Sequence, residues 1–130
     1  MVIDTSVLVA ILTGEPERRS FIEALEAADS AVMSVASFVE ISILMEARHG
    51  ADGLRQLDLF LERSAIELIP VDGEQGLWAR RAFGQFGKGR HPAALNYGDC
   101  FVYALAKVRG EKLLFKGNDF SRTDLEAAVG

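Results

Sequence analysis

The chain has 130 residues, of which 49% are hydrophobic and 25% charged, and these values indicate one globular domain and exclude a disordered or fibrous chain. The net charge of −5 argues against a general nucleic-acid coat, which would be basic, and a single cysteine excludes an internal disulfide. No apolar run is long enough to cross a bilayer and the N-terminus has no signal-peptide pattern, so we expect a cytoplasmic protein without a membrane partner.

Short apolar runs alternate with helical patterns along the whole chain. Four runs predict strands, of which the first is buried and the third alternates, and a fifth predicts a short edge strand, at residues 1–3, 31–34, 67–71, 112–115 and 125–129. Apolar residues at helical spacing predict helices at about residues 7–12, 16–25, 37–50, 52–65, 72–86 and 99–108. A glycine-rich basic stretch at 87–92 predicts a flexible loop. Because strands that alternate with helices form parallel sheets, we expect the α/β class: one domain over residues 1–130, with a mostly parallel central sheet and helices on both faces.

Polar residues near the predicted helix starts match capping patterns. Asp4 can cap the first helix, and Asn96 can cap the last one with Asp99 at its third position. Ser37 and Glu40 have the spacing of a capping box, which predicts a helix start at Ser37. Capping alone would explain each acid taken singly, and this structural interpretation stays open beside a functional one.

Four acids share a second property, because each stands where an apolar, strand-like run gives way to a helix-like segment or opens a helix pattern. They are Asp4, Glu40, Asp99 and Asp119. The carboxyl ends of parallel strands lie at one edge of the sheet, so we expect these side chains to share one pocket. Gathered carboxylates repel one another, and a divalent cation relieves that repulsion. Oxygen donors without a cysteine cluster favour Mg²⁺, with Mn²⁺ as a substitute, and such a site suits phosphodiester hydrolysis by an activated water.

Three basic residues in the predicted loop are candidate contacts for nucleic-acid phosphates. They are Lys88, Arg90 and His91. Solvent-facing loop positions would have the same composition, so both interpretations remain open.

The ordered set of motifs resembles the PIN-domain family and, within it, the VapC toxins of type II toxin–antitoxin systems. The motifs are MVIDTS at 1–6, SFVE at 37–40, NYGDC at 96–100 and LLFKGNDF at 113–120. The resemblance covers the whole chain. It implies a PIN domain with Mg²⁺-dependent endoribonuclease activity on RNA, a homodimer, and a VapB-type antitoxin that neutralises the enzyme by placing its tail in the acidic groove.

The resemblance also implies the roles of individual residues. The family's catalytic and metal-binding quartet corresponds to Asp4, Glu40, Asp99 and Asp119, and a hydroxyl of Thr5 or Ser6 would support the first acid. Many members have Thr-x-Asp-x-Asp-Phe after the fourth strand, whereas this chain has Phe115 and Gly117 at the first two of those positions. Asp119 would therefore supply the fourth carboxylate alone or with help from Asp124.

Two other functions remain open at this stage. One is a PIN-type nuclease that acts in RNA processing or on DNA structures, and the other is a noncatalytic binding module with the same fold. Apolar stripes at 41–45 and 54–61 offer material for a dimer interface, although both could equally be buried within one subunit.

Overall fold

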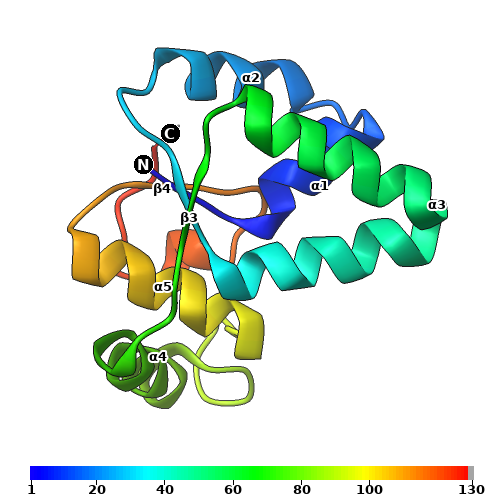
Figure 1. Cartoon of the computed structure of the whole chain (residues 1–130). Coiled ribbons are helices and arrows are strands. Elements are labelled where there is room, and N and C mark those ends of the chain that lie inside the picture. The colour runs from blue at the N-terminus through cyan, green and yellow to red at the C-terminus, as the bar shows by residue number, and fades with distance from the viewer. Residues whose placement is uncertain (129–130) are drawn as a thin grey trace.

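Four short parallel strands form the centre of the computed structural model, which describes residues 1–128 (Figure 1). Their order in the sheet is β3-β2-β1-β4. The strands are β1 (Val2–Ile3), β2 (Val32–Ser34), β3 (Glu67–Ile69) and β4 (Leu113–Leu114). Each neighbouring pair is parallel, and Val2 of β1 lies opposite Val32 on one side and Leu113 on the other. The predicted α/β class with a parallel sheet is confirmed.

Helices of very different length connect these strands. They are α1 (Thr5–Thr13), α2 (Arg18–Ala27), α3 (Val35–Arg63), α4 (Gly73–Phe86), α5 (Tyr97–Arg109) and the short 3₁₀ helix η1 (Phe120–Arg122). The long α3 consists of two helical segments that meet at Gly50, where φ is +62°. Glycine adopts this left-handed conformation without steric cost, so the two helices predicted on either side of it are both present. No helix in residues 1–128 has the length and apolarity needed to span a membrane.

The two faces of the sheet bury alternate residues of each strand. Val2, Val32 and Leu113 pack with α4 and α5 in one core. The residues that follow them, Ile3, Met33 and Leu114, pack with α1, α2 and α3 in a second core. Successive strand residues point to opposite faces, so each two-residue apolar doublet supplies both cores at once. Figure 1 shows the resulting arrangement, with α4 and α5 below the strands and α1, α2 and α3 above and to the right of them.

Two predicted boundaries are wrong. The helix after β2 begins at Val35 and not at Ser37, because Ser34 caps it by accepting the N–H of Ala36 at 3.1 Å. Ser37 is buried within the first turn, and Glu40 lies in the second turn, so the predicted capping box between them does not form. The helix can start at once because Ser34 combines strand pairing with the extended backbone of an N-cap.

The predicted edge strand at 125–129 is reduced to one bridge between Leu113 and Ala127, and Val129 lies outside the described residues. The loop after α4 is present as predicted, and its own hydrogen bonds close it. The N–H of Lys88 donates to the carbonyl of Leu95, and the N–H of Leu95 donates to the carbonyl of Phe86.

Candidate active site

All four predicted acids line one cleft beyond the carboxyl ends of β1 and β4. Its volume is about 470 Å³. The residues around it are Asp4, Thr5, Ser6, Val9, Glu15, Glu40, Leu44, Asp99, Lys116, Gly117, Asp119 and Phe120. The structure therefore brings together acids that are up to 115 positions apart in the chain, from Asp4 to Asp119. The expectation of a shared pocket is confirmed, while the roles of the acids stay a prediction.

Asp4 is the most buried of the four acids, with 6% of its surface exposed. It caps α1, and its Oδ2 accepts the N–H of Ser6 at 3.1 Å and the hydroxyl of Ser6 at 2.5 Å. Burial raises the pKa of Asp4, the two contacts from Ser6 oppose this, and the charge of Glu40 adds to the rise. Of the two candidate supporting hydroxyls, it is Ser6 that contacts the acid.

Thr5 is also buried, but its Oγ1 has no hydrogen-bond partner in the described residues. A buried hydroxyl without a partner is costly, and this one belongs to the wall of the cleft.

Asp99 occupies the third position of α5 and forms the predicted capping box with Asn96. The N–H of Asp99 donates to Asn96 Oδ1 at 2.9 Å, and the N–H of Asn96 donates to Asp99 Oδ2 at 3.0 Å. The pKa of Asp99 is raised to about 6: burial is the largest cause, the hydrogen bond from Asn96 opposes it, and the charges of Asp4, Asp119 and Glu40 add to the rise. The capping and functional interpretations of Asp99 are therefore compatible, because Oδ2 accepts the capping hydrogen bond while the same carboxylate lines the acidic cleft.

Glu40 reaches the cleft from α3 and lies against Gly98 of α5. A Cβ atom on residue 98 would collide with Glu40 Oε2 and stand 3.2 Å from its Cδ. The position of the Glu40 carboxylate therefore depends on a residue without a side chain next to Asp99.

Asp119 is exposed and precedes η1, and its side chain makes no capping hydrogen bond. Asp124 does not line the cleft. Its carboxylate accepts the hydroxyl of Tyr103 at 2.7 Å and pairs with Lys107 at 2.5 Å. Asp124 is thus engaged in separate contacts with α5, and its help to Asp119 stays an untested suggestion.

The three basic loop residues do not line the acidic cleft. Lys88 is exposed, and the Arg90 guanidinium lies 5.5 Å from the ring centre of Phe83. Nδ1 of His91 accepts the N–H of Ala93 at 3.0 Å. This local bond leaves Nε2 of His91 as its remaining polar atom.

A divalent cation fits the chemistry of the cleft. The four predicted carboxylates line it together with Glu15, and the charges of Asp4, Asp119 and Glu40 raise the pKa of Asp99. Within residues 1–128 no three His, Cys, Asp or Glu side chains are grouped closely enough to hold a metal ion between them. Mg²⁺ does not require such a cage, since it keeps several waters and binds through one or two carboxylates together with substrate phosphate oxygens.

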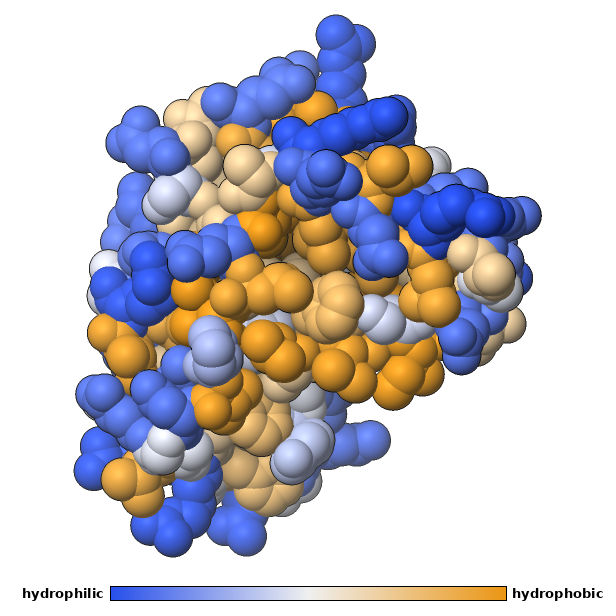
Figure 2. Space-filling view, in the orientation of Figure 1, coloured by the Kyte–Doolittle hydropathy of each residue, from blue (hydrophilic) through white to orange (hydrophobic). Residues whose placement is uncertain are grey.

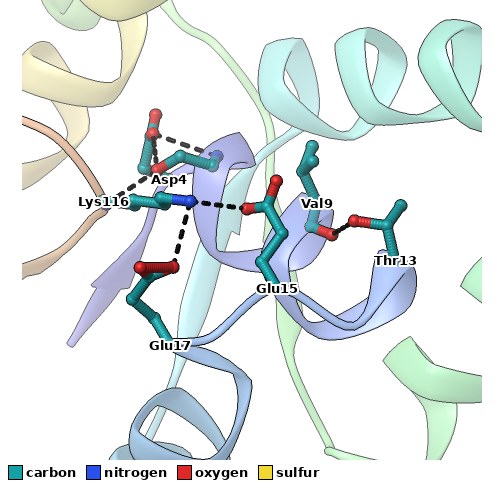
Figure 3. A network of polar contacts seen from close by, with 7 residues as sticks. Asp4, Val9, Thr13, Glu15, Glu17 and Lys116 are labelled. Carbon is teal, nitrogen blue, oxygen red and sulfur yellow. Dashed lines mark hydrogen bonds and ion pairs between the residues drawn. The ribbon is translucent and has the colours of Figure 1, made fainter.

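Sequence reasoning missed three residues at this site, namely Gly98, Glu15 and Lys116. Figure 3 shows Lys116 next to Asp4, with its ammonium group between Glu15 and Glu17. For Lys116 the sequence offered two signals: its place in a basic stretch with Lys107, Arg109 and Lys112, and its position between the two residues that depart from the family pattern after the fourth strand.

Comparisons with known proteins agree with this geometry. The family model described as "PIN domain" matches residues 1–126. "Ribonuclease VapC30" of Mycobacterium tuberculosis is 53% identical over 125 residues, which are 96% of this chain and 95% of that protein. "Ribonuclease VapC" of Mycolicibacterium smegmatis is 53% identical over 127 residues, or 98% of both chains. The crystal structure of VapBC2 from Rickettsia felis, bound to a DNA fragment from its promoter, has a chain that superposes with a TM-score of 0.78 at 15% identity, over 97% of this chain and 94% of that one.

Proposed function

The chain belongs to the PIN-domain family and is a ribonuclease of the VapC type, and we propose that it hydrolyses RNA at the cleft lined by Asp4, Glu40, Asp99 and Asp119. One observation carries the proposal: four acids, from the cap of α1, the second turn of α3, the first turn of α5 and the segment before η1, meet in a single pocket, where their charges act on one another. Helix capping alone would not require all four acids to lie in one pocket.

Members of this family depend on a metal, and we propose Mg²⁺ here, with Mn²⁺ as a substitute. Asp4, Asp99, Glu40 and Asp119 would hold it. When bound, the cation supplies positive charge for the phosphate and lowers the pKa of a water. Ser6 keeps the Asp4 carboxylate in one orientation, and the capping box does the same for Asp99.

The proposed RNA contacts are Lys88, Arg90 and His91. Their position supports this role, because a hydrogen bond joins their loop to the segment that follows Asp119. Nη1 of Arg122, in η1, donates to the carbonyl of Pro92 at 3.2 Å. An RNA strand that leaves the cleft past Asp119 would meet this loop, and its phosphates would be attracted to the three side chains.

The proposed protein partners are a VapB-type antitoxin and a second copy of the chain. A toxin–antitoxin complex of the same fold supports the first. The second is supported by apolar side chains left in water on α3 and α5, of which Val39 is 48%, Ile43 64% and Tyr97 79% exposed. We call these three residues the apolar band. Figure 2 shows apolar surface across the middle of the molecule, where α5 and the first half of α3 lie in Figure 1. The remaining apolar residues predicted as interface material within 41–61, including Ile41 and Leu57, are buried within the subunit.

The test is cleavage of total cellular RNA by the purified, antitoxin-free protein with Mg²⁺ or Mn²⁺. We expect discrete cuts that EDTA abolishes and that leave 5′-phosphate and 3′-hydroxyl ends. Asp4→Asn should remove cleavage, whereas Asp58→Asn, on the exposed surface of α3 away from the cleft, should not. Cyclic phosphate ends, or cleavage that survives EDTA, would contradict the mechanism. RNA binding without cleavage would favour the noncatalytic module.

A further inference from the structure

Lys116 is fixed at the mouth of the acidic cleft by its own backbone. Its N–H donates to Ser6 Oγ at 2.9 Å, and the same hydroxyl donates to Asp4 Oδ2 at 2.5 Å. One serine therefore joins the end of β4 to the first acid. Two hydrogen bonds, through the Ser6 hydroxyl, therefore fix the backbone of Lys116 relative to the Asp4 carboxylate.

Two glutamates from the connection between α1 and α2 hold the side chain of Lys116. Nζ donates to Glu15 Oε1 at 3.0 Å and lies 3.0 Å from Glu17 Oε2. We call these three residues the lysine clamp (Figure 3). The Glu17 contact is an ion pair without hydrogen-bond geometry, since Glu17 Oε2 is buried with no hydrogen-bond partner in the described residues. An ammonium group has three donors, so Lys116 keeps donor capacity for another acceptor.

The charge around the cleft makes this lysine exceptional. The acids that line the cleft are Asp4, Glu15, Glu40, Asp99 and Asp119. Lys116 is the only lysine or arginine among the described residues that line it. An RNA strand carries one negative charge per phosphate, and it must approach a wall of the same sign. The Lys116 ammonium offsets part of this negative charge and would attract a phosphate.

The clamp is weak enough to be exchanged. The side chains of Lys116 and Glu15 are 37% and 33% exposed, and an ion pair this open to water contributes little. The Glu17 side chain is 39% exposed, although its Oε2 is buried. Two carboxylates around one ammonium also leave one negative charge in excess, which a simple ion pair between two side chains would not have. A phosphate that reaches Nζ replaces one of these contacts by another of the same kind.

We propose that Lys116 binds a phosphate of the RNA substrate at the mouth of the acidic cleft, and that Glu15 and Glu17 hold its ammonium group there until RNA replaces one of them. This inference rests on the proposed function of the cleft. A purely structural role, in which the clamp fastens the α1–α2 connection to β4, makes different predictions.

The experiment measures kcat and KM for a fluorescent single-stranded RNA at several KCl concentrations and constant Mg²⁺. Lys116→Met removes the charge and keeps the length of the side chain, and its backbone bond to Ser6 is unaffected. We expect kcat/KM to fall about tenfold, mainly through KM, and the slope of log(kcat/KM) against log[KCl] to become shallower by about 0.7, the value for one lost phosphate contact on a single strand. Lys116→Arg should keep the slope of the wild type.

Lys112→Met is the matched control. Lys112 precedes the same strand at its opposite end, is exposed, and pairs with Glu126 at 3.4 Å, so the net charge changes equally away from the cleft. Equal kinetics and equal salt slopes in the two methionine variants would overturn the proposal. A fall in thermal stability of Lys116→Met with unchanged salt dependence would assign the clamp to the fold instead. Failure of the proposed function would be seen separately, as a wild type that does not cleave.

Glu17→Gln tests the clamp itself. In the wild-type background we expect kcat/KM to rise by about two- to fivefold, because one competitor of the phosphate loses its charge. In the Lys116→Met background the same change should have no effect. An equal rise in both backgrounds would mean that Glu17 acts only by general repulsion, and would overturn the clamp.

Discussion

Replacing Gly98 by alanine tests whether the position of the Glu40 carboxylate matters, because the two residues meet with no room between them. The new methyl group would collide with Glu40 Oε2, the far end of a flexible side chain, and not with backbone. To reach ordinary contact at 3.4 Å the carboxylate must shift by about 1 Å, and a displacement of that size at a reacting group lowers rates by about 10²-fold. Gly98 also lies in the first turn of α5, where alanine is the better helix former by about 0.5–1 kcal/mol.

We therefore expect Gly98→Ala to lose about 10²-fold in kcat/KM while its free energy of unfolding stays equal or rises. Urea unfolding and RNA cleavage measured on one preparation separate the two effects. Gly76→Ala is the control, since a Cβ atom there meets nothing within 4 Å and α4 gains the same helix propensity. In a Glu40→Gln background Gly98→Ala should have no further effect on activity. Unchanged cleavage by Gly98→Ala would refute the reasoning that the cleft requires Glu40 in its present place.

Four further predictions follow from contacts already described. Asp99→Asn should abolish cleavage and raise the free energy of unfolding at pH 7.5 by about 1 kcal/mol, a value reduced from the full pKa shift because Asp99 is partly exposed. The pKa of Asp99 is raised to about 6, so the wild-type folded state loses stability as pH rises from about 4 to about 6. Urea titrations should therefore show the stability difference between Asp99→Asn and the wild type shrinking toward pH 4. Ser6→Ala should cost about 1–3 kcal/mol in urea unfolding, because Asp4 and the N–H of Lys116 both lose a partner. Burial raises the pKa of the Cys100 thiol to about 11, so mass spectrometry should find iodoacetamide modification at pH 8 only after unfolding. Ile43→Glu in the apolar band should convert a dimer to a monomer in sedimentation experiments without loss of folding.

Much of the fold could be predicted because its signals are local. Each central strand contains two consecutive apolar residues, which the sequence shows directly. Successive strand residues point to opposite faces, so one of the two packs on each face of the sheet. The break between the two segments of α3 could also be predicted, since Gly50 takes a conformation that other residues avoid. These features depend on few residues that are close together in the chain.

The errors occur where distant pairing decides between equal local signals. Ser34 and Ser37 are both acceptable caps, and Ser34 is chosen because β2 pairs with β3 up to that residue, opposite Ile69. The segment 125–129 has strand-like composition, but among its described residues only Ala127 forms a bridge with β4. No pattern within either segment carries this information.

The candidate site divides in the same way. The acids could be found because each follows a recognisable junction between a strand and a helix. The partners that position them could not, because the contact of Lys116 with Glu15 spans 101 positions and that of Gly98 with Glu40 depends on how α3 crosses α5. Ser6 contacts Asp4 and Thr5 does not, and two adjacent hydroxyl residues in the sequence do not reveal which of them will do so.

The place of β1 in the sheet has a consequence for the order of events during synthesis. β1 is made first but lies between β2 and β4, and its partner β4 is made more than 100 residues later. Asp119 and Lys116 follow β4, so a growing chain that still holds this segment inside the ribosome has three of its acids and no complete cleft. Contacts this far apart in the chain also form late in folding. If the cleft is the active site, as we propose, we expect an enzyme that could attack the RNA around it during translation to gain its activity only after this last strand has left the ribosome.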